Sequence, residues 1–466
     1  MTKILRFAFI ITILLIGQYH ISAQSVINLM TENQPNPIGL TVKQPKFSWQ
    51  VKPVTKNTKQ TAYQLIIASS EANLKKNIGD VWDSKKVNST QSVSNNFSGK
   101  ELGAGKKYFW KVKIWNEKAK PSAWSMPSFF EMGNFEKLIW IANWIGKIDP
   151  EKKGIKALDF QKEFKLNKRA TKIKVYASGL GAYYLIINGK KVGNNVLATA
   201  MSKYSDTLFY QTYELDPELI SPGTNFISAS VGNGFWGSGH LGLPSSIMSD
   251  GPNRLLFQME LSFYDGSVQT VASDASWQVK NSATVASSIY AGETYDGQLE
   301  YSKDWKNADI LDEANSTITF YETGSVKGKE KSLNFSTKNK ILVASSKNAT
   351  QIAEEIKAVK VNSPKKNQHV FDFGKTITGF VQLSVEGKAD KEVEITFSET
   401  LDKKGFVDQS AMKIKPKDVY ILKGYSTEIW EPKFTYHKFR YAQISGYSGK
   451  VDINSLIAKV IANISQ

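Results

Sequence analysis

Apolar residues recur at every second position over much of this chain, and this period most constrains the fold. The pattern runs through 108–114, 255–263, 381–385 and 393–397. Because successive side chains of a strand point to opposite faces, the pattern predicts strands with one buried face. Many short strands separated by turns are typical of β-sandwiches and jelly rolls. With no long amphipathic helical pattern beside them, the sequence predicts an all-β protein of tandem β-sandwiches.

The composition fits folded domains whose stability comes from packing alone. Hydrophobic residues make up 41% of the 466 residues and aromatic residues 12%, enough for several buried cores. The chain has no cysteine, so disulfides and thiolate chemistry are excluded. The length favours about two to four domains.

The basic charge argues against a nucleic-acid partner. The formal net charge is +17, but only four of the 60 basic residues are arginines, whose forked side chains nucleic-acid readers favour. The lysines are dispersed, mostly at turns such as 106–107 and 365–366. A lysine-rich solvated surface is the preferred interpretation, and weak attraction to acidic polysaccharide is an alternative.

The first 23 residues resemble a secretory signal peptide. Lys3 and Arg6 precede an apolar run at 7–16, and Ser22-Ala23 ends before an expected cut at Gln24. An uncleaved anchor is the alternative, although the run is short for a membrane span. We therefore expect an exported protein, periplasmic or extracellular, with no membrane span after cleavage.

The next segment, 25–133, resembles a fibronectin type III domain. It places Trp49 on an early strand, Trp110 in a later Tyr-x-Trp strand, and Trp124 in a Ser-Ala-Trp-Ser stretch. Large rings fill the core of a thin sandwich, so these tryptophans are expected to be structural. A spacer or docking role follows for this segment.

Two further segments carry the remaining strand patterns. The segment 135–335 contains Asn188-Gly189, a pair typical of a tight hairpin turn. The segment 339–447 contains the paired patterns at 381–385 and 393–397. The last stretch, 448–466, has no evident strand partner in the sequence.

Four short motifs occur in the order found in bacterial α-L-rhamnosidases. They read GAYYLIING at 181–189, GETYD at 292–296, DFG at 372–374 and FTYHKFRY at 434–441. The chain thus resembles this glycoside hydrolase family over about 140–447. The resemblance implies a jelly-roll, carbohydrate-binding-like domain at 135–335 and a concanavalin-like β-sandwich at 339–447.

The resemblance also implies where catalysis takes place in the family. Two carboxyl groups of a helical barrel, C-terminal to the FTYH block, carry out inverting hydrolysis. No residue of this sequence takes those positions, so we predict no catalytic residue and expect 448–466 to begin the linker to an absent barrel. The predicted role is the non-catalytic N-terminal portion, a truncated product or fragment, of a secreted α-L-rhamnosidase acting on terminal α-L-rhamnose of plant or microbial glycans.

A glycine-rich loop at 232–240 is the strongest candidate for a carbohydrate site. Its glycines allow close backbone approach, and Trp236 offers a flat face for a sugar ring. Asn233 and His240 add hydrogen-bonding groups. In the alternative interpretation, the loop connects two strands and its tryptophan covers a core.

The GETYD motif supplies further candidates for the same site. Glu293 and Asp296, with Tyr295 between them, could reach a sugar or a calcium ion. In the alternative interpretation, the carboxylates accept hydrogen bonds from backbone donors between strands. These candidates motivate a second hypothesis, a stand-alone rhamnose- or carbohydrate-binding protein without hydrolytic activity.

His437 and Arg440 belong to the FTYH block. The surrounding aromatic residues place them on a strand, where we expect them to bond across the sandwich or to a neighbouring barrel. No serine or carboxylate at a recognisable spacing indicates a catalytic histidine.

Overall fold

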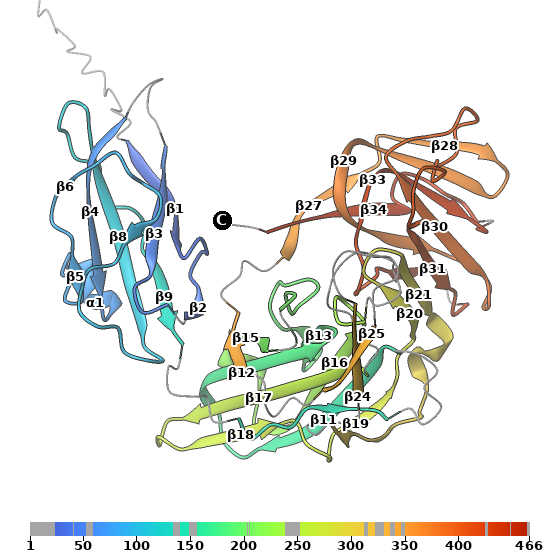
Figure 1. Ribbon diagram of the computed structural model, residues 1–466, viewed down its shortest axis with the longest axis horizontal. Coiled ribbons are helices and arrows are strands. Elements are labelled where there is room, and N and C mark those ends of the chain that lie inside the picture. Colours follow the sequence, from blue (N-terminus) through green and yellow to red (C-terminus); the bar gives the residue numbers. More distant parts are fainter. Residues whose placement is uncertain are drawn as a thin grey trace, which may run out of the picture.

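Three β-rich domains follow one another along the chain in a computed structural model (Figure 1). The structure describes residues 24–463 except 41, 53–58, 134–139, 149–155, 203, 205, 238–251, 312–315, 322–329, 336–340, 346–349, 425–426 and 448. The predicted signal peptide, 1–23, lies outside the described residues. Within them the only α-helix is α1 (Glu71–Lys75), and no helix is long and apolar enough to cross a membrane. The all-β expectation is therefore confirmed.

The first domain is a sandwich of two sheets. One sheet has the order β1-β3-β7 and the other β2-β9-β8-β4-β5, with β6 paired to β4. The strands are β1 (Ser25–Thr31), β2 (Ile38–Leu40), β3 (Lys46–Lys52), β4 (Gln60–Ala68), β5 (Trp82–Asp83), β6 (Val87–Asn88), β7 (Asn95–Asn96), β8 (Lys107–Asn116) and β9 (Ser128–Met132). Trp49 and Trp110 lie fully buried between the sheets, as the sequence predicted.

The second domain packs two larger sheets face to face. Their orders are β23-β10-β17-β12-β15-β26, with β18 paired to β17, and β14-β13-β16-β11-β19-β22. The strands are β10 (Ile145–Gly146), β11 (Leu158–Leu166), β12 (Ala170–Leu180), β13 (Ala182–Ile187), β14 (Lys190–Lys191), β15 (Thr207–Leu215), β16 (Gly223–Gly232), β17 (Arg254–Phe263), β18 (Val268–Ala272), β19 (Gln278–Asn281), β22 (Lys306–Asn307), β23 (Asp309–Ile310) and β26 (Ile341–Ala344). Alternate residues of β17, including Phe257 and Met259, fill the core between them.

The third domain is built on one ten-stranded sheet of order β20-β21-β31-β30-β33-β29-β34-β27, with β28 and β32 also paired to β29. The strands are β20 (Thr284–Ser288), β21 (Gly292–Asp296), β27 (Thr350–Lys357), β28 (Lys360–Lys365), β29 (Gln368–Val385), β30 (Glu392–Ser398), β31 (Lys417–Ile421), β32 (Glu428–Trp430), β33 (His437–Ser445) and β34 (Leu456–Asn463). The long strand β29 pairs with β33 over its first half and with β34 over its second half.

Four short elements complete the described secondary structure. β24 (Ser316–Tyr321) and β25 (Glu330–Phe335) pair with each other as a separate two-stranded sheet. Two 3-10 turns, η1 (Pro217–Leu219) and η2 (Gly297–Tyr301), follow β15 and β21.

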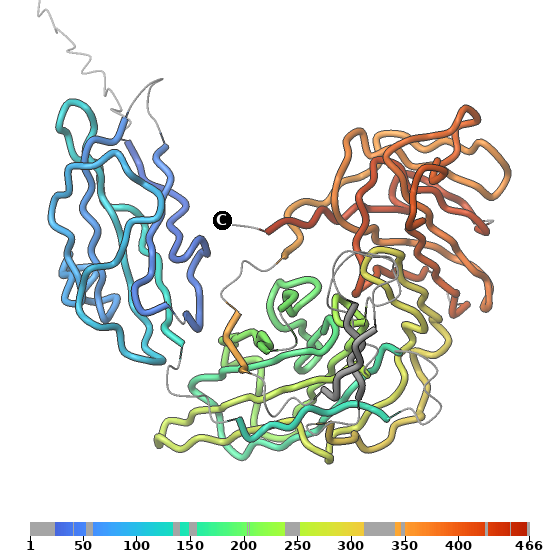
Figure 2. Tube along the Cα trace, viewed as in Figure 1, coloured from blue at the N-terminus to red at the C-terminus, as the bar shows by residue number. Residues whose placement is uncertain are grey.

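Strand exchange links the second and third domains. β20 and β21 precede β22 in the chain, yet β21 pairs with β31 of the third domain. Figure 2 shows this yellow segment beside the orange strands of the third domain. β26 crosses in the other direction and pairs with β15. The two domains are therefore interleaved along the sequence, because each lends strands to the other's sheet.

The C-terminal stretch is part of the third domain. A linker was expected from position 448, but β34 forms an inner strand of the sheet between β29 and β27. Leu456 and Ala458 are fully buried in the domain core. The sandwich therefore extends to 463 and not only to 447, because alternate apolar residues of this stretch complete the core.

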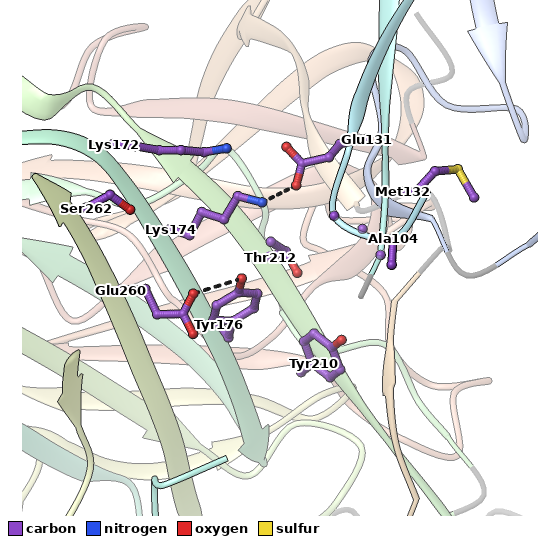
Figure 3. Close-up of a pocket in the computed structure, with 13 residues that line it drawn as sticks. Ala104, Glu131, Met132, Lys172, Lys174, Tyr176, Tyr210, Thr212, Glu260 and Ser262 are labelled. Carbon is purple, nitrogen blue, oxygen red and sulfur yellow. Dashed lines mark hydrogen bonds and ion pairs between the residues drawn. The ribbon is translucent and has the colours of Figure 1, made fainter. Parts of the chain in front are cut away.

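The first and second domains meet at charged pairs around a cavity of about 300 Å³ (Figure 3). Lys174 of β12 contacts Glu131 of β9, and Lys107 Nζ lies 2.8 Å from Glu214 Oε2. Tyr176 Oη lies 3.5 Å from Glu260 Oε2 on the wall of this cavity. Polar side chains therefore make up much of this joint.

Candidate functional site

Two of the four motifs meet at Glu293, where the strand β21 enters the sheet of the third domain. β21 runs parallel to β31, with Thr294 opposite Val419. Gly292 has φ +120°, and a Cβ atom there would lie 1.9 Å from the Lys417 carbonyl oxygen. Only glycine fits such a close approach. The glycine of the GETYD motif is thus required to bring Glu293 against β31.

Glu293 is buried, with 1% of its surface exposed, and its carboxylate accepts three hydrogen bonds. Oε2 accepts from the backbone N–H groups of Lys433 and Phe434, both at 2.9 Å. Oε1 accepts from the Thr284 hydroxyl at 3.0 Å. The carboxylate of one motif therefore holds the backbone at the start of the FTYH block.

Burial raises the pKa of Glu293 to about 7, although the two backbone N–H groups favour the charged form. The nearby Asp418 carboxylate acts in the same direction as burial. Loss of solvation disfavours the carboxylate more than the hydrogen bonds favour it. Near neutral pH, Glu293 therefore exists in both protonation states.

Asp418 and His437 extend this buried cluster. Asp418 Oδ1 accepts from the Glu293 backbone N–H at 2.9 Å. His437 Nε2 lies 3.2 Å and 3.1 Å from the two Asp418 oxygens, and both side chains are fully buried. The imidazole stacks on Phe397, with ring centroids 4.3 Å apart.

His437 makes its contacts with Asp418 through one ring nitrogen, Nε2. In the part of the chain that the structure describes, buried Nδ1 has no hydrogen-bond partner. The contact therefore joins His437 of β33 to Asp418 of β31, two strands of the same ten-stranded sheet.

Phe434 of the FTYH block inserts into the second domain. Its side chain is 1% exposed and packs with Ala157 and Ala182. A Cβ atom on Gly232 would lie 2.3 Å from the Phe434 ring. The absence of a side chain at position 232 therefore creates the space that this aromatic ring fills.

Asn233 lies next to the same joint. Its backbone N–H donates to Ser287 Oγ at 3.1 Å, and its Nδ2 donates to the Ser287 carbonyl at 2.9 Å. Its Oδ1 accepts from Asn253 Nδ2 at 3.0 Å. Asn233 thus ties the end of β16 to β20, and its polar atoms are used in that contact.

Arg440 of the FTYH block and Asp372 of the DFG motif form an ion pair in the third domain. Arg440 Nε lies 2.9 Å from Asp372 Oδ1, and Nη2 lies 3.0 Å from Oδ2. Asp372 Oδ1 also accepts from the Gly374 N–H at 2.7 Å. The guanidinium lowers the pKa of Asp372. This bidentate ion pair joins β29 to β33 close to Gly374.

The proposed sugar-stacking residue lies in a core. Trp236 is 1% exposed and packs edge-to-face on Tyr204, with centroids 5.2 Å apart. Trp144 and Leu180 belong to the same cluster. No face of the indole is open to a sugar. Its surroundings agree with the alternative interpretation, in which the tryptophan covers a core. His240 lies outside the described residues.

Tyr295 and Asp296 also serve the local structure. The Tyr295 ring stacks on Tyr420 at 5.9 Å. Asp296 caps η2 by accepting from the Gln298 N–H at 3.0 Å. The described candidates therefore lie in separate structural contacts and do not form a surface that faces a sugar.

The described candidates do not fit a calcium ion, which needs about six to eight oxygen ligands. Both Glu293 oxygens and the Asp296 carboxylate accept protein hydrogen bonds. Among the described residues, no group of three or more histidine, aspartate or glutamate side chains is placed to hold a metal.

Sequence reasoning missed Asp418 and Thr284. Asp418 follows Lys417 at the start of β31 and precedes Val419, Tyr420 and Ile421. A lone carboxylate that opens an apolar strand is a signal of a buried, hydrogen-bonded acid. Nothing in the spacing of the sequence pairs it with a glutamate 125 residues earlier.

An open cavity of about 730 Å³ lies where all three domains approach one another. Its lining includes amide side chains from each domain and two aromatic rings: Asn33, Asn195, Gln211, Asn463, Phe235 and Tyr436. Such convergent amides beside aromatic rings can bind hydroxyl groups and the apolar face of a sugar.

Three family models match successive parts of the chain. Residues 26–136 match the Rha78A-like N-terminal immunoglobulin domain, 168–354 the α-L-rhamnosidase N-terminal domain, and 362–462 the bacterial α-L-rhamnosidase concanavalin-like domain. The first match is an immunoglobulin-type sandwich, an architecture that fibronectin type III domains share. The third match includes most of β34, in agreement with its pairing.

Curated relatives carry the same description. An α-L-rhamnosidase of Formosa agariphila is 32% identical over 92% of this chain and 46% of its own length. An α-L-rhamnosidase of Alteromonas is 27% identical over 88% of this chain and 44% of its own length. The chain thus spans about half the length of these curated relatives.

Solved structures share the fold. The α-L-rhamnosidase of Dictyoglumus thermophilum superposes with a TM-score of 0.72 and 32% identity, covering 94% of this chain and 48% of that one. The Streptomyces avermitilis α-L-rhamnosidase complexed with L-rhamnose gives a TM-score of 0.75 at 22% identity, covering 94% and 57%. At that identity the second likeness supports the fold alone.

Proposed function

Because the chain carries the immunoglobulin-like, N-terminal and concanavalin-like domains of the α-L-rhamnosidases, we propose that it supports and positions the catalytic part of such an enzyme. The proposed enzyme hydrolyses terminal α-L-rhamnose on plant or microbial glycans. In this role the three domains form the N-terminal part of the enzyme and do not supply the catalytic acids.

The buried joint around Glu293 is the observation that carries the proposal. Inverting hydrolysis needs two carboxyl groups that face the sugar, about 6.5–9.5 Å apart, with room for a water molecule between them. Glu293 and Asp418 are buried, and their oxygens accept hydrogen bonds from protein groups. These two acids therefore stabilise the buried joint and are closed to a substrate.

Export is part of the proposal and rests on the first 23 residues. Their basic start, apolar run and small residues before Gln24 are typical of a secretory signal. We place the mature protein in the periplasm or outside the cell, where polymeric glycans are accessible. Separation of cells into cytoplasmic, periplasmic and medium fractions, followed by N-terminal sequencing, tests this part, and a cytoplasmic protein that retains Met1 would contradict it.

An activity assay of the purified chain tests the central proposal. We expect no turnover of an aryl α-L-rhamnoside above the buffer rate, with a complete α-L-rhamnosidase as the positive control. Turnover that co-purifies with the chain and is lost in Glu293→Gln would overturn the proposal, because it would place catalysis at the joint.

Carbohydrate binding without hydrolysis is the second candidate role, and the three-domain cavity favours it. Its amide groups and the rings of Phe235 and Tyr436 suit a rhamnose-bearing glycan. Calorimetry with L-rhamnose, with and without calcium, tests this role. Heat that disappears in Gln211→Ala supports binding at the cavity, whereas no heat at millimolar sugar would dismiss it.

A further inference from the structure

Lysine and tryptophan side chains alternate on the outer face of the larger sheet in the first domain. Trp110, Val112 and Ile114 of β8 point into the core, so the intervening residues point outward. Lys111 and Lys113 are two of these outward residues. Trp115 continues the series, and the loop residue Trp124 and Lys86 lie beside it.

Four cation–π contacts join these five residues into one array, which we call the lysine–tryptophan ladder. Lys86 Nζ lies 5.0 Å from the Trp115 ring centroid, and Lys113 Nζ lies 5.2 Å from the same ring. Lys113 Nζ also lies 4.6 Å from the Trp124 ring, and Lys111 Nζ lies 5.3 Å from it. Each indole therefore contacts two ammonium groups, and Lys113 contacts both indoles.

The segment that carries Trp124 is fixed against β8. Ser122 Oγ accepts from the Ile114 N–H, and Ser125 Oγ accepts from the Val112 N–H, both at 3.1 Å. The backbone N–H groups of the same two serines donate to the carbonyls of Ile114 and Val112. The indole between Lys111 and Lys113 is thus held by four hydrogen bonds, and the ladder is formed before any ligand arrives.

The ammonium groups of the ladder have no carboxylate partner in the described part of the chain. The lysines that do pair lie beyond it, as in Lys85 with Asp83 at 2.9 Å and Lys107 with Glu214 at 2.8 Å. Lys111 is only 7% exposed, and burial lowers its pKa. A buried ammonium normally has a counter-ion, since indole rings neutralise no charge.

We infer that the lysine–tryptophan ladder is a binding face for an anionic polysaccharide, whose sulfate or carboxylate groups supply the missing counter-ions. A row of ammonium groups, two on β8 and one just before β6, matches a polymer that carries repeated negative charges. The formal net charge of +17 adds long-range attraction for such a polymer. This face would hold the protein on a charged glycan independently of any hydrolysis.

The ladder suits an acidic glycan better than a nucleic acid. Proteins that bind single strands stack bases on open aromatic faces. Here Trp115 is contacted by Lys86 and Lys113, and Trp124 by Lys111 and Lys113. The indoles are occupied as supports for the ammonium groups, so the ladder presents mainly charge and hydrogen-bond donors.

Surface plasmon resonance with immobilised polysaccharides tests the inference on the full chain. The probes are dextran sulfate and polygalacturonate, which separate sulfate from carboxylate, with uncharged dextran as the reference. We expect binding to one or both anionic polymers and none to dextran. The double variant Lys86→Gln/Lys113→Gln changes the two more exposed lysines. It should weaken binding, with an apparent Kd raised on the order of tenfold.

The matched control is Lys365→Gln/Lys366→Gln, which removes the same charge from an exposed turn of the third domain. It should change the Kd by less than about twofold, and both variants should keep the thermal transition of the parent. An equal loss in the two variants would overturn the inference in favour of dispersed charge. Tighter binding of single-stranded DNA than of either anionic polymer would also overturn it.

Discussion

Glu293 and Phe434 lie 141 residues apart in the sequence, yet a 2.9 Å hydrogen bond joins them. This contact explains at the level of single residues why the GETYD and FTYH motifs occur together. The glutamate supplies acceptors for backbone N–H groups, and Gly292 lets it approach β31. The motifs that resemble an enzyme family are therefore structural at this joint.

The raised pKa of Glu293 predicts a pH-dependent stability. The unfolded chain loses this proton near the ordinary pKa of glutamate, whereas the folded protein keeps it up to about pH 7. Between these values the folded state binds more protons, so the free energy of unfolding falls as pH rises. Between these two pKa values, the protonation of Glu293 changes the free energy of unfolding on the order of 3 kcal/mol.

The variant Glu293→Gln isolates this contribution, because Asp418 and His437 stay in place. We expect urea unfolding between pH 5 and pH 8 to show a flatter pH dependence in the variant than in the parent. The control Glu392→Gln changes an exposed carboxylate and should keep the parent slope. Parallel pH profiles for the parent and Glu293→Gln would contradict the prediction.

Gly292→Ala tests the close approach of β21 to β31. The added methyl group would collide with the Lys417 carbonyl oxygen, and φ is +120°. We expect a loss of about 2–4 kcal/mol in the free energy of unfolding, measured by chemical denaturation. The control Gly266→Ala has φ +79° but no atom within 4 Å, and should lose only about 1 kcal/mol. Equal losses would rule out the steric explanation.

At the scale of elements, the two-residue period predicted strands well. The patterns at 108–114 and 255–263 correspond to β8 and β17, and those at 381–385 and 393–397 to β29 and β30. Asn188-Gly189 forms the turn between β13 and β14, with φ +47° and +78°. These features depend on neighbours in the sequence, so local reasoning was sufficient.

Local reasoning failed for β34, which pairs with β27 and β29. β34 follows the last motif but does not pair with β33, the strand before it in the sequence. Its partner β29 lies 73 residues earlier at the pair formed by Leu456 and Leu383. Strand formation at such a separation depends on pairing within the assembled sheet and not on the adjacent residues in the sequence.

Leu456→Ala tests whether β34 contributes to the third domain. Leu456 is fully buried in the core, so removing its side chain should reduce the free energy of unfolding by about 2–4 kcal/mol. The control Ile457→Ala lies on the other face of the strand and should lose less than about 1 kcal/mol. A linker would give no loss in either variant when followed by urea unfolding.

At the scale of the whole molecule, the two joints between domains differ in chemistry. Charged pairs such as Lys107–Glu214 connect the first and second domains. A buried network with exchanged strands connects the second and third domains. Salt screens exposed charges more than buried contacts. The second and third domains should therefore behave as one unit, with the first domain attached more loosely.

Phe434→Ala tests this unit directly. The variant leaves a cavity beside Gly232 and should weaken the coupling between the second and third domains by about 3–5 kcal/mol. Calorimetry should then resolve two transitions where the parent shows one for this pair. The control Phe226→Ala removes a ring that is 55% exposed and should keep the parent profile. A single unchanged transition in Phe434→Ala would contradict a shared unit.

Most strands, their buried faces and the order of the family motifs could be predicted from the sequence, because each depends on residues close together in the chain. The fold was needed to show that Glu293, Asp418 and His437 form one buried cluster, and that Trp236 fills a core. Sheet pairing joins strands more than 100 residues apart, and desolvation at those contacts sets the pKa of Glu293. Spacing along a chain does not encode which distant strands pack together, so the roles of the motif residues follow from the fold.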